Sequence, residues 1–165
     1  MEHDRIVLSI RPQFVDAIFA GRKRFELRKR RPAIGPGAVV YVYCTAPRQA
    51  IVGRFVCGNV HAGRPEELWA RFGRLSSICP AQFAEYFEGS EIGYALEIEQ
   101  VVRWREPLSL SAIRGLTPRF WPPQFHRRID AGEPLLRYLS ERDRGTSVFF
   151  GEGSAHRQVA ATGYC

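Results

Sequence analysis

Three ionisable residues in one short stretch have the types and spacing to act together on a ligand. Lys23, Glu26 and Arg28 bring an amine, a carboxylate and a guanidinium close together in the chain. Phe25 and Leu27 alternate with the last two, and this period of two is typical of a strand with one buried face. The pattern therefore predicts that Glu26 and Arg28 project together from the polar face. Lys23 lies in the corner that precedes the strand, from which its amine can reach the same side.

The choice of lysine within this cluster is informative. The chain has 24 basic residues, of which only Lys23 and Lys29 are lysines. A lysine in an otherwise arginine-based chain favours a role for a compact amine that can lose its proton. The alternative is an ordinary ion-pair ladder on a solvated strand face, which contributes little to stability.

Length and charge set the class of protein. The 165 residues, 45% of them hydrophobic, predict one globular domain with a substantial core. The net charge of +7 favours a polyanionic partner such as nucleic acid. The basic residues concentrate in two segments, and the second segment also has aromatic residues between its arginines. The predicted nucleic-acid contacts are Arg22, Arg24, Lys29, Arg30 and Arg31 in the first segment and Arg119, Trp121, Arg127 and Arg128 in the second.

The second basic segment has a composition that suits single-stranded nucleic acid. Bases stack on aromatic rings while guanidinium groups meet phosphates. A rigid Pro122-Pro123 pair stands between Trp121 and Phe125. The alternative is that these two aromatic side chains plug the core of the fold.

Other classes of protein are disfavoured. No stretch approaches the roughly 20 apolar residues of a membrane span, and the N-terminus does not have the pattern of a secretory signal, so we expect a cytoplasmic protein. Cys44, Cys57, Cys79 and Cys165 lack the spacing of a zinc site. We predict no metal and no cofactor, and buried free thiols at Cys44 and Cys57.

Hydrophobic periodicity and turn residues predict an α+β fold. The expected strands are 6–10, 25–28, 38–44, 51–57 and 94–102, and the expected helices are 12–21, 64–72, 80–87 and 133–142. Residues 108–113 fit either a strand or a helical turn, and 146–150 fit an extra edge strand. Gly53, inside a strand, indicates a bulge or a close approach of another chain segment. We expect one domain over 1–150 and a loosely ordered tail over 151–165.

The charged cluster is also part of a recognisable pattern. Gly21-x-Lys23-x-x-Glu26-x-Arg28 resembles the signature of the ASCH domain, a member of the PUA-like superfamily. The segments 8–12 before it, and 43–47 with 51–53 after it, are similar to the first, third and fourth strands of that family. The resemblance extends over roughly the first two-thirds of the chain. It implies a small mixed β-barrel with surrounding helices and a function linked to RNA.

The resemblance also implies where a ligand lies. It places the loop that contains Thr45 beside the Lys23–Glu26–Arg28 cluster, and Pro-Pro-Gln-Phe, ending in Gln124 and Phe125, is similar to a late motif that closes over the cleft. Arg11 stands at a strand-to-helix junction that is expected to face the same cleft. The predicted ligand-binding residues are Arg11, Lys23, Glu26, Arg28, Thr45, Gln124 and Phe125. The predicted function is recognition of RNA, or of a plain or modified nucleotide within RNA; DNA remains an alternative.

Two alternatives from other classes stay open. The first is a hydrolase on the same scaffold, acting on N4-acetylcytidine or as a ribonuclease, with Lys23 and Glu26 as its catalytic residues. Relatives that hydrolyse N4-acetylcytidine use a threonine three residues after the lysine, and this chain has Glu26 there. The second is a protein-interaction module, against which the basic clusters argue.

Overall fold

The computed structural model describes residues 4–145, and the prediction of an extra strand at 146–150 and a tail at 151–165 lies outside the described residues. The strands are β1 Arg5–Ile10, β2 Phe25–Arg28, β3 Val39–Cys44, β4 Ala50–Gly63, β5 Gly93–Ser109 and β6 Arg127–Arg128. The helices are α1 Pro12–Phe19, α2 Pro65–Phe72, a 3₁₀ turn Gly73–Leu75, α3 Pro80–Phe87, α4 Leu110–Leu116 and α5 Pro134–Gly145. The α+β class predicted from the sequence is confirmed.

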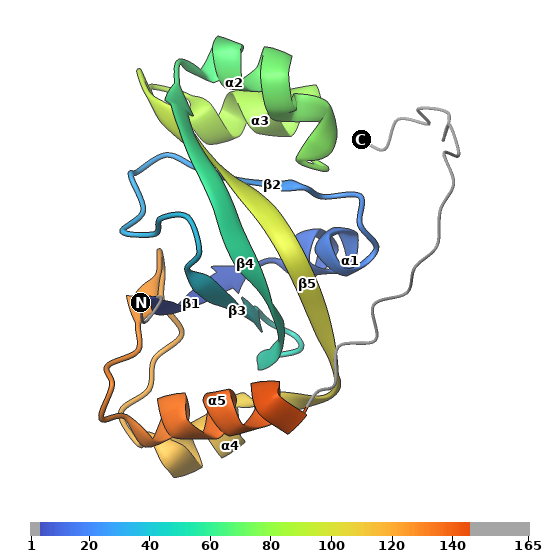
Figure 1. Cartoon of the computed structure of the whole chain (residues 1–165). Coiled ribbons are helices and arrows are strands. Elements are labelled where there is room, and N and C mark those ends of the chain that lie inside the picture. The colour runs from blue at the N-terminus through green and yellow to red at the C-terminus, as the bar shows by residue number, and fades with distance from the viewer. Residues whose placement is uncertain (1–3, 146–165) are drawn as a thin grey trace.

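The six described strands form one mixed sheet in the order β2-β5-β4-β3-β1-β6. β1 and β3 are parallel and the other neighbours are antiparallel. The long, bent strands β4 and β5 run through the length of the molecule in Figure 1, with α2 and α3 at one end and α4 and α5 at the other. The bends have a local cause, because the β4–β5 register shifts at several points, one of them at Gly53. A Cβ at Gly53 would lie 2.2 Å from the carbonyl oxygen of Val102, so the predicted close approach is confirmed.

The two edges of the curved sheet are β2 and β6, and the seam between them is where the candidate site lies. The short strand β6 pairs with β1 at Ile6 and Val7. Within residues 4–145, no backbone ladder joins β2 to β1 or to β6. The second half of β1 therefore faces β2 across a gap that side chains must bridge.

Apolar side chains fill the space on both sides of the sheet. One core cluster joins β1, β3 and β4 to α1, and a second joins the other faces of β1 and β3 to α4 and α5. A third packs α2 and α3 on Phe25 and Leu27 of β2. The burial of Phe25 and Leu27 holds β2 in place, so the polar residues between and after them are fixed relative to the seam.

Most predicted elements are present, and two strands are longer than predicted. β4 continues to Gly63 and β5 continues to Ser109, because each supplies hydrogen-bond partners for the other along its length. Residues 108–113, for which the sequence fits either a strand or a helical turn, contain the end of β5 and the start of α4. Helix α3 has the predicted bounds.

Candidate ligand-binding cleft

Helix α1 and strand β2 meet in a tight corner that positions Lys23. The helix ends at Phe19, and Gly21 takes a positive φ of 74° that turns the chain back. The backbone N–H groups of Arg22 and Lys23 both donate to the carbonyl of Ala17. The corner is therefore closed by α1 itself, and the Lys23 side chain is only 4% exposed.

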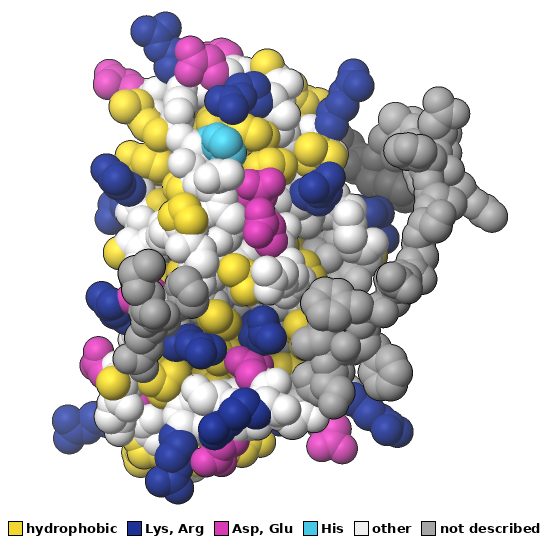
Figure 2. Space-filling model, in the orientation of Figure 1, with side chains coloured by type: hydrophobic (Ala, Val, Ile, Leu, Met, Phe, Trp, Pro, Cys, Tyr) yellow, Lys and Arg dark blue, Asp and Glu magenta, His cyan; other side chains and the backbone are white. Residues whose placement is uncertain are grey.

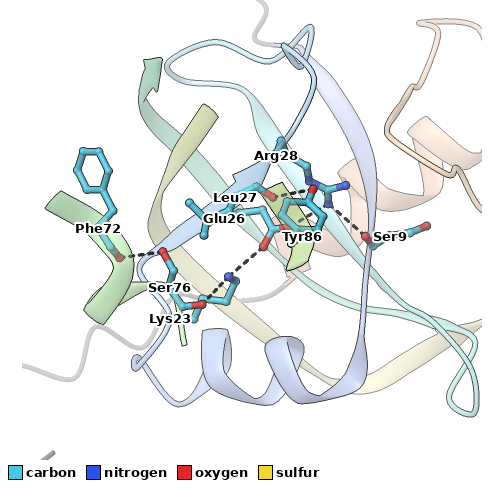
Figure 3. A network of polar contacts seen from close by, with 8 residues as sticks. All are labelled: Ser9, Lys23, Glu26, Leu27, Arg28, Phe72, Ser76 and Tyr86. Atoms are coloured by element: carbon cyan, nitrogen blue, oxygen red, sulfur yellow. Dashed lines mark hydrogen bonds and ion pairs between the residues drawn. The ribbon is translucent and has the colours of Figure 1, made fainter. Parts of the chain in front are cut away.

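Lys23, Glu26 and Arg28 form one ion-pair network (Figure 3). The two carboxylate oxygens of Glu26 lie 3.2 Å from Lys23 Nζ and 3.0 Å from an Arg28 guanidinium nitrogen. Lys23 Nζ also donates to the carbonyl of Ser76 at 2.8 Å, and the Phe14 ring lies beneath the amine at 4.8 Å. Glu26 thus holds two cations at the polar face of β2, as the alternation predicted.

Burial and charge act in opposite directions on the Lys23 amine. Removal from water lowers the pKa of Lys23 below its ordinary value of 10.5, while the neighbouring Glu26 carboxylate opposes that shift. Burial is the larger effect, and the positive charge of Arg28 adds to it. With two cations around one carboxylate, the network is left with an excess of positive charge facing the seam.

Arg28 bridges the seam of the sheet. Its guanidinium donates to the carbonyl of Ser9 in β1 at 3.2 Å and to the carbonyl of Phe125 at 3.4 Å. Arg28 Nε is buried and has no hydrogen-bond partner among the described residues. The side chain therefore takes the place of a missing backbone ladder and holds three segments around one opening.

A cleft of about 1060 Å³ lies over this network. Its floor contains Lys23, Glu26 and Arg28, and its walls come from the end of β1, the start of α1, the loop after β2, helix α3 and the segment before β6. The lining residues with polar or aromatic side chains are Ser9, Arg11, Gln13, Phe14, Lys23, Glu26, Arg28, Lys29, Arg30, Arg31, Thr45, Gln82, Glu85, Tyr86, Gln124, Phe125 and His126. This volume accommodates a nucleotide-sized ligand.

The cleft gathers all seven of the predicted ligand-binding residues. Thr45 and Arg11 come to its edge because β1 and β3 are parallel and end together, and the Thr45 N–H donates to the carbonyl of Ile10. Arg11, Arg30 and Arg31, called the rim arginines below, are exposed and line the opening. They place positive charge at the opening, while Lys23 and Glu26 of the floor are buried.

Comparison with known proteins assigns the fold to a family. The sequence model of the ASCH domain family matches residues 8–103 of this chain. A protein of Zymomonas mobilis described as an ASCH domain-containing ribonuclease is 32% identical over 120 residues, which cover 72% of this chain and 79% of that protein. The chain belongs to the ASCH domain family.

Solved structures agree with this assignment. The crystal structure of ASCH from Zymomonas mobilis superposes with a TM-score of 0.77 at 28% identity and covers 82% of this chain and 94% of that one. The N-terminal domain of Staphylothermus marinus McrB covers 88% of this chain and 99% of that domain with a TM-score of 0.54 at 12% identity, which shows a similar fold only. The PUA-like fold expected from the sequence is therefore confirmed.

The first basic segment of this ASCH domain divides into two groups. Lys29 and two of the rim arginines line the cleft, with the Lys29 amine over the Tyr86 ring. Arg22 and Arg24 are exposed in the α1–β2 corner and do not line it. The basic segment thus continues from the cleft onto the neighbouring surface.

The second basic segment is also divided. Arg127 forms an ion pair with Glu133, and Arg128 forms one with Asp4, so both help to hold β6 in place. Arg119 is exposed outside the cleft. The prediction of nucleic-acid contacts remains open for all three, but the two ion pairs give Arg127 and Arg128 a structural role that local composition did not indicate.

The exposure of two aromatic side chains in the same segment rules out the alternative that they fill the core. Trp121 is 74% exposed and Phe125 is 49% exposed, so the interpretation that they plug the core is wrong. The buried aromatic is their neighbour Phe120, which packs near Tyr43. Phe125 lines the cleft with Gln124, and Arg30 lies over its ring at 4.9 Å.

Sequence reasoning missed several cleft residues of the ASCH domain. Tyr86 is not among the predicted ligand-binding residues, but it lines the cleft, is partly exposed and donates its hydroxyl to the carbonyl of Leu27 at 3.4 Å. His126 was not singled out; it is half-buried in the cleft, and burial together with the charge of Arg28 lowers its pKa. The helical period places Phe83, Tyr86 and Phe87 at i, i+3 and i+4 on one side of α3, so it gave no signal that separates Tyr86 from its two core neighbours.

The remaining expectations concern metals, thiols and membranes. Among residues 4–145, no group of three or more His, Cys, Asp or Glu side chains is arranged to hold a metal ion. Cys44 and Cys57 are buried free thiols, as predicted. In the same part of the chain, no helix combines the length and apolar composition needed to cross a membrane.

Proposed function

We propose that this ASCH domain binds single-stranded RNA and takes one nucleotide into the cleft. The observation that carries the proposal is the arrangement of one cleft of about 1060 Å³ with a buried Lys23–Glu26–Arg28 floor and exposed rim arginines. The relative described as a ribonuclease supports RNA as the class of partner. The net charge of +7 supports it as well, because a polyanion gains from contact with a basic opening.

The parts of the cleft suit different parts of a nucleotide. The rim arginines meet phosphates, where guanidinium groups form paired charge-assisted hydrogen bonds. Tyr86 and Phe125 supply aromatic faces for a base on two sides of the opening. Thr45 and Gln124 offer hydroxyl and amide groups that can read the edges of a base or ribose.

Glu26 has a different role from the one that its charge first suggests. Both of its oxygens already accept from cations, so its first task is to hold Lys23 and Arg28 in one place. Each carboxylate oxygen retains further acceptor capacity, which leaves room for a contact with an exocyclic amine of a base. Glu26 stands where hydrolases of N4-acetylcytidine have a threonine nucleophile, and a carboxylate tied to two cations is a poor substitute for it.

A second candidate function is cleavage of the bound RNA. The ribonuclease description of the Zymomonas mobilis relative favours it, and so does His126 in the cleft. Burial and the charge of Arg28 lower the pKa of His126 and favour its neutral imidazole, the form that can accept the proton of a ribose 2′-hydroxyl. That oxygen would then attack phosphorus to form a 2′,3′-cyclic phosphate and expel the 5′-oxygen, which takes a proton from water, while Lys23 and Arg28 stabilise the charge on the phosphorane.

Titration of a labelled single-stranded RNA at increasing salt tests the proposal. We expect an affinity that falls with salt, with a slope that becomes shallower by about 0.7 for each phosphate contact removed. The Arg30→Ala/Arg31→Ala variant removes two rim charges, and Arg137→Ala/Arg144→Ala removes two exposed charges of α5 as the matched control. RNA length before and after incubation reports cleavage in the same samples. Absent binding at low salt, or an equal effect of both variants, would contradict the proposal.

A further inference from the structure

The segment between α4 and β6 carries two exposed aromatic rings, each with a guanidinium over it. Arg114 lies over the Trp121 ring at 5.0 Å, and Arg30 lies over the Phe125 ring at 4.9 Å. The cleft includes Phe125 and the intervening prolines but not Trp121. The ring of Trp121 is therefore outside the cleft, at the far end of the same short segment.

Both ends of this segment are fixed in the core. Phe120 is fully buried, with the Arg127 guanidinium over its ring at 5.2 Å. After the exposed rings, the Ile129 N–H donates to the carbonyl of Arg5 at 2.9 Å, and β6 pairs with β1. In Figure 1 the connection runs from the α4 end of the molecule towards β1 and β6. Trp121 is thus exposed on a proline-containing segment whose two ends are anchored in the fold.

Arg114 orients the Trp121 ring from one side. Its Nε donates to the carbonyl of Phe120, and its guanidinium covers one face of the indole. Because the tryptophan is 74% exposed, the opposite face remains open to solvent. An indole with one face held by a cation and the other free is suited to stack on a flat ligand ring.

The segment is also connected to the floor of the cleft. The carbonyl of Phe125 accepts from Arg28, and Pro122 to His126 form part of the cleft wall. A strand of RNA that leaves the cleft along this wall passes Phe125 and reaches Trp121, with the exposed Arg119 beside it. The positive charge of Arg114 and Arg119 matches the phosphates of that strand.

We propose that Trp121 is a second stacking site, for a base of single-stranded RNA that flanks the nucleotide in the cleft. This inference rests on the proposed RNA binding and adds a direction and a minimum length to it. The cleft takes one nucleotide, and the Arg114–Trp121 pair takes a neighbouring base without reading its identity, because every base has a face that can stack.

The test compares uridine monophosphate, which can fill only the cleft, with an oligouridylate of about ten nucleotides, a length within the range that such surfaces occupy. We expect Trp121→Ala to weaken binding of the oligouridylate by about fivefold or more, the effect of one lost stacked base, and to leave the affinity for uridine monophosphate unchanged. Trp121→Phe keeps an aromatic face and should recover most of the loss. Ile92→Ala, which removes another exposed apolar side chain outside the cleft, is the matched control.

The outcomes separate the two proposals. If wild type binds neither uridine monophosphate nor the oligouridylate, the proposed function fails. If wild type binds the oligouridylate and Trp121→Ala binds it equally well, RNA binding stands and the stacking site is wrong. An equal loss for uridine monophosphate and the oligouridylate would also overturn the inference, because Trp121 would then act on the cleft itself.

Discussion

Two ion-pair networks of this protein have similar chemistry and different surroundings. In the cleft, Glu26 lies between Lys23 and Arg28 at the open seam of the sheet. At the other network, called the α5 clasp below, Asp143 of α5 lies between Arg54 of β4 and Arg5 of β1. Both place one carboxylate among cations in a partly or fully buried position, so the difference between them lies in what they enclose.

The charged groups of the α5 clasp contact one another and the hydroxyl of Tyr41. The hydroxyl of Tyr41 donates to Asp143 at 2.7 Å, and Arg5 donates to the same hydroxyl at 3.2 Å. None of the four residues Arg5, Tyr41, Arg54 and Asp143 lines the cleft. The clasp is therefore a closed arrangement that fastens α5 to three strands of the sheet.

The cleft network is closed below and open above. The carbonyl of Ser76, a buried residue that does not line the cleft, accepts from Lys23, while the cleft of about 1060 Å³ lies over the network. Arg28 Nε has no partner among the described residues. A network left incomplete beside a cavity can gain from a ligand, whereas a complete one gains only from the fold.

The surface gives a second view of this difference. On the face shown in Figure 2, Lys and Arg side chains are scattered over the surface and along its outline, and one group of acidic side chains lies near the middle, over β4 and β5. That face has no single basic patch. At the cleft, by contrast, three exposed arginines line one opening.

The largest expected effect is a loss of folding stability when the charge of Asp143 is removed from the α5 clasp. Asp143→Asn keeps the shape of the side chain and removes the charge that compensates Arg54 and Arg5. We expect a loss of roughly 2 kcal/mol in unfolding free energy, below the 3–5 kcal/mol of a fully buried pair because the arginines retain some water contact. For a domain of this size the melting temperature should fall by roughly 4–8 °C, with RNA affinity unchanged in the folded protein.

Asp16→Asn is the control for this prediction. Asp16 pairs with Arg48 through two hydrogen bonds, but both side chains are exposed. The loss should be within about 1 kcal/mol. Thermal melts of the two variants decide the question, and equal small losses would show that the clasp contributes no more than a surface pair.

The next effect concerns binding. Arg28→Gln removes the guanidinium that bridges the seam and faces the cleft, and we expect RNA affinity to fall about tenfold, the equivalent of one charge-assisted hydrogen bond. Arg54→Gln removes the same group from the α5 clasp and should lower the melting temperature with little effect on affinity. Both proteins are titrated with RNA at a temperature well below their melting transitions. A comparable affinity loss in the two variants would remove the distinction between the networks.

The smallest expected effect concerns the pH dependence of the unfolding free energy, to which Lys23 and Tyr41 contribute with opposite signs. The pKa of Lys23 is lowered in the folded state, so the unfolded chain binds more protons between that lowered pKa and 10.5, and Lys23 makes stability rise with pH across this window. Burial and Asp143 raise the pKa of Tyr41 above its ordinary value of 10, so Tyr41 makes stability fall as pH rises beyond about 10.

Denaturant melts of wild type, Lys23→Met and Tyr41→Phe from neutral to alkaline pH separate these contributions. Relative to wild type, Lys23→Met should lose stability as pH rises towards 10.5, because it lacks the favourable deprotonation. Tyr41→Phe should gain relative stability above pH 10, because it has no phenol to ionise. Parallel curves for all three proteins would mean that neither group titrates differently on folding.

Much of the cleft was predictable because its chemistry is local. The alternation of Phe25 and Leu27 fixed which face of β2 carries Glu26 and Arg28, and Gly21 marked the corner that holds Lys23. Similarity to the ASCH pattern added Thr45 and the Gln124–Phe125 segment, whose positions no local period predicts. The same local reasoning could not distinguish Tyr86 from its core neighbours on α3.

The sequence by itself determined the class of fold, the polar face of β2 and the pairing of Lys23, Glu26 and Arg28. These features depend on side-chain spacing within a few residues, and strand and helix geometry convert that spacing directly into contacts. Only the tertiary structure decided that Ser76 holds the Lys23 amine, that Arg28 bridges to Phe125, and that Asp143 meets Arg54. Those partners lie far apart in the chain, and the bends of β4 and β5 together with the burial of α5 bring them together. Local periodicity sets the direction of a side chain, whereas its distant partner is selected by the packing of the whole sheet.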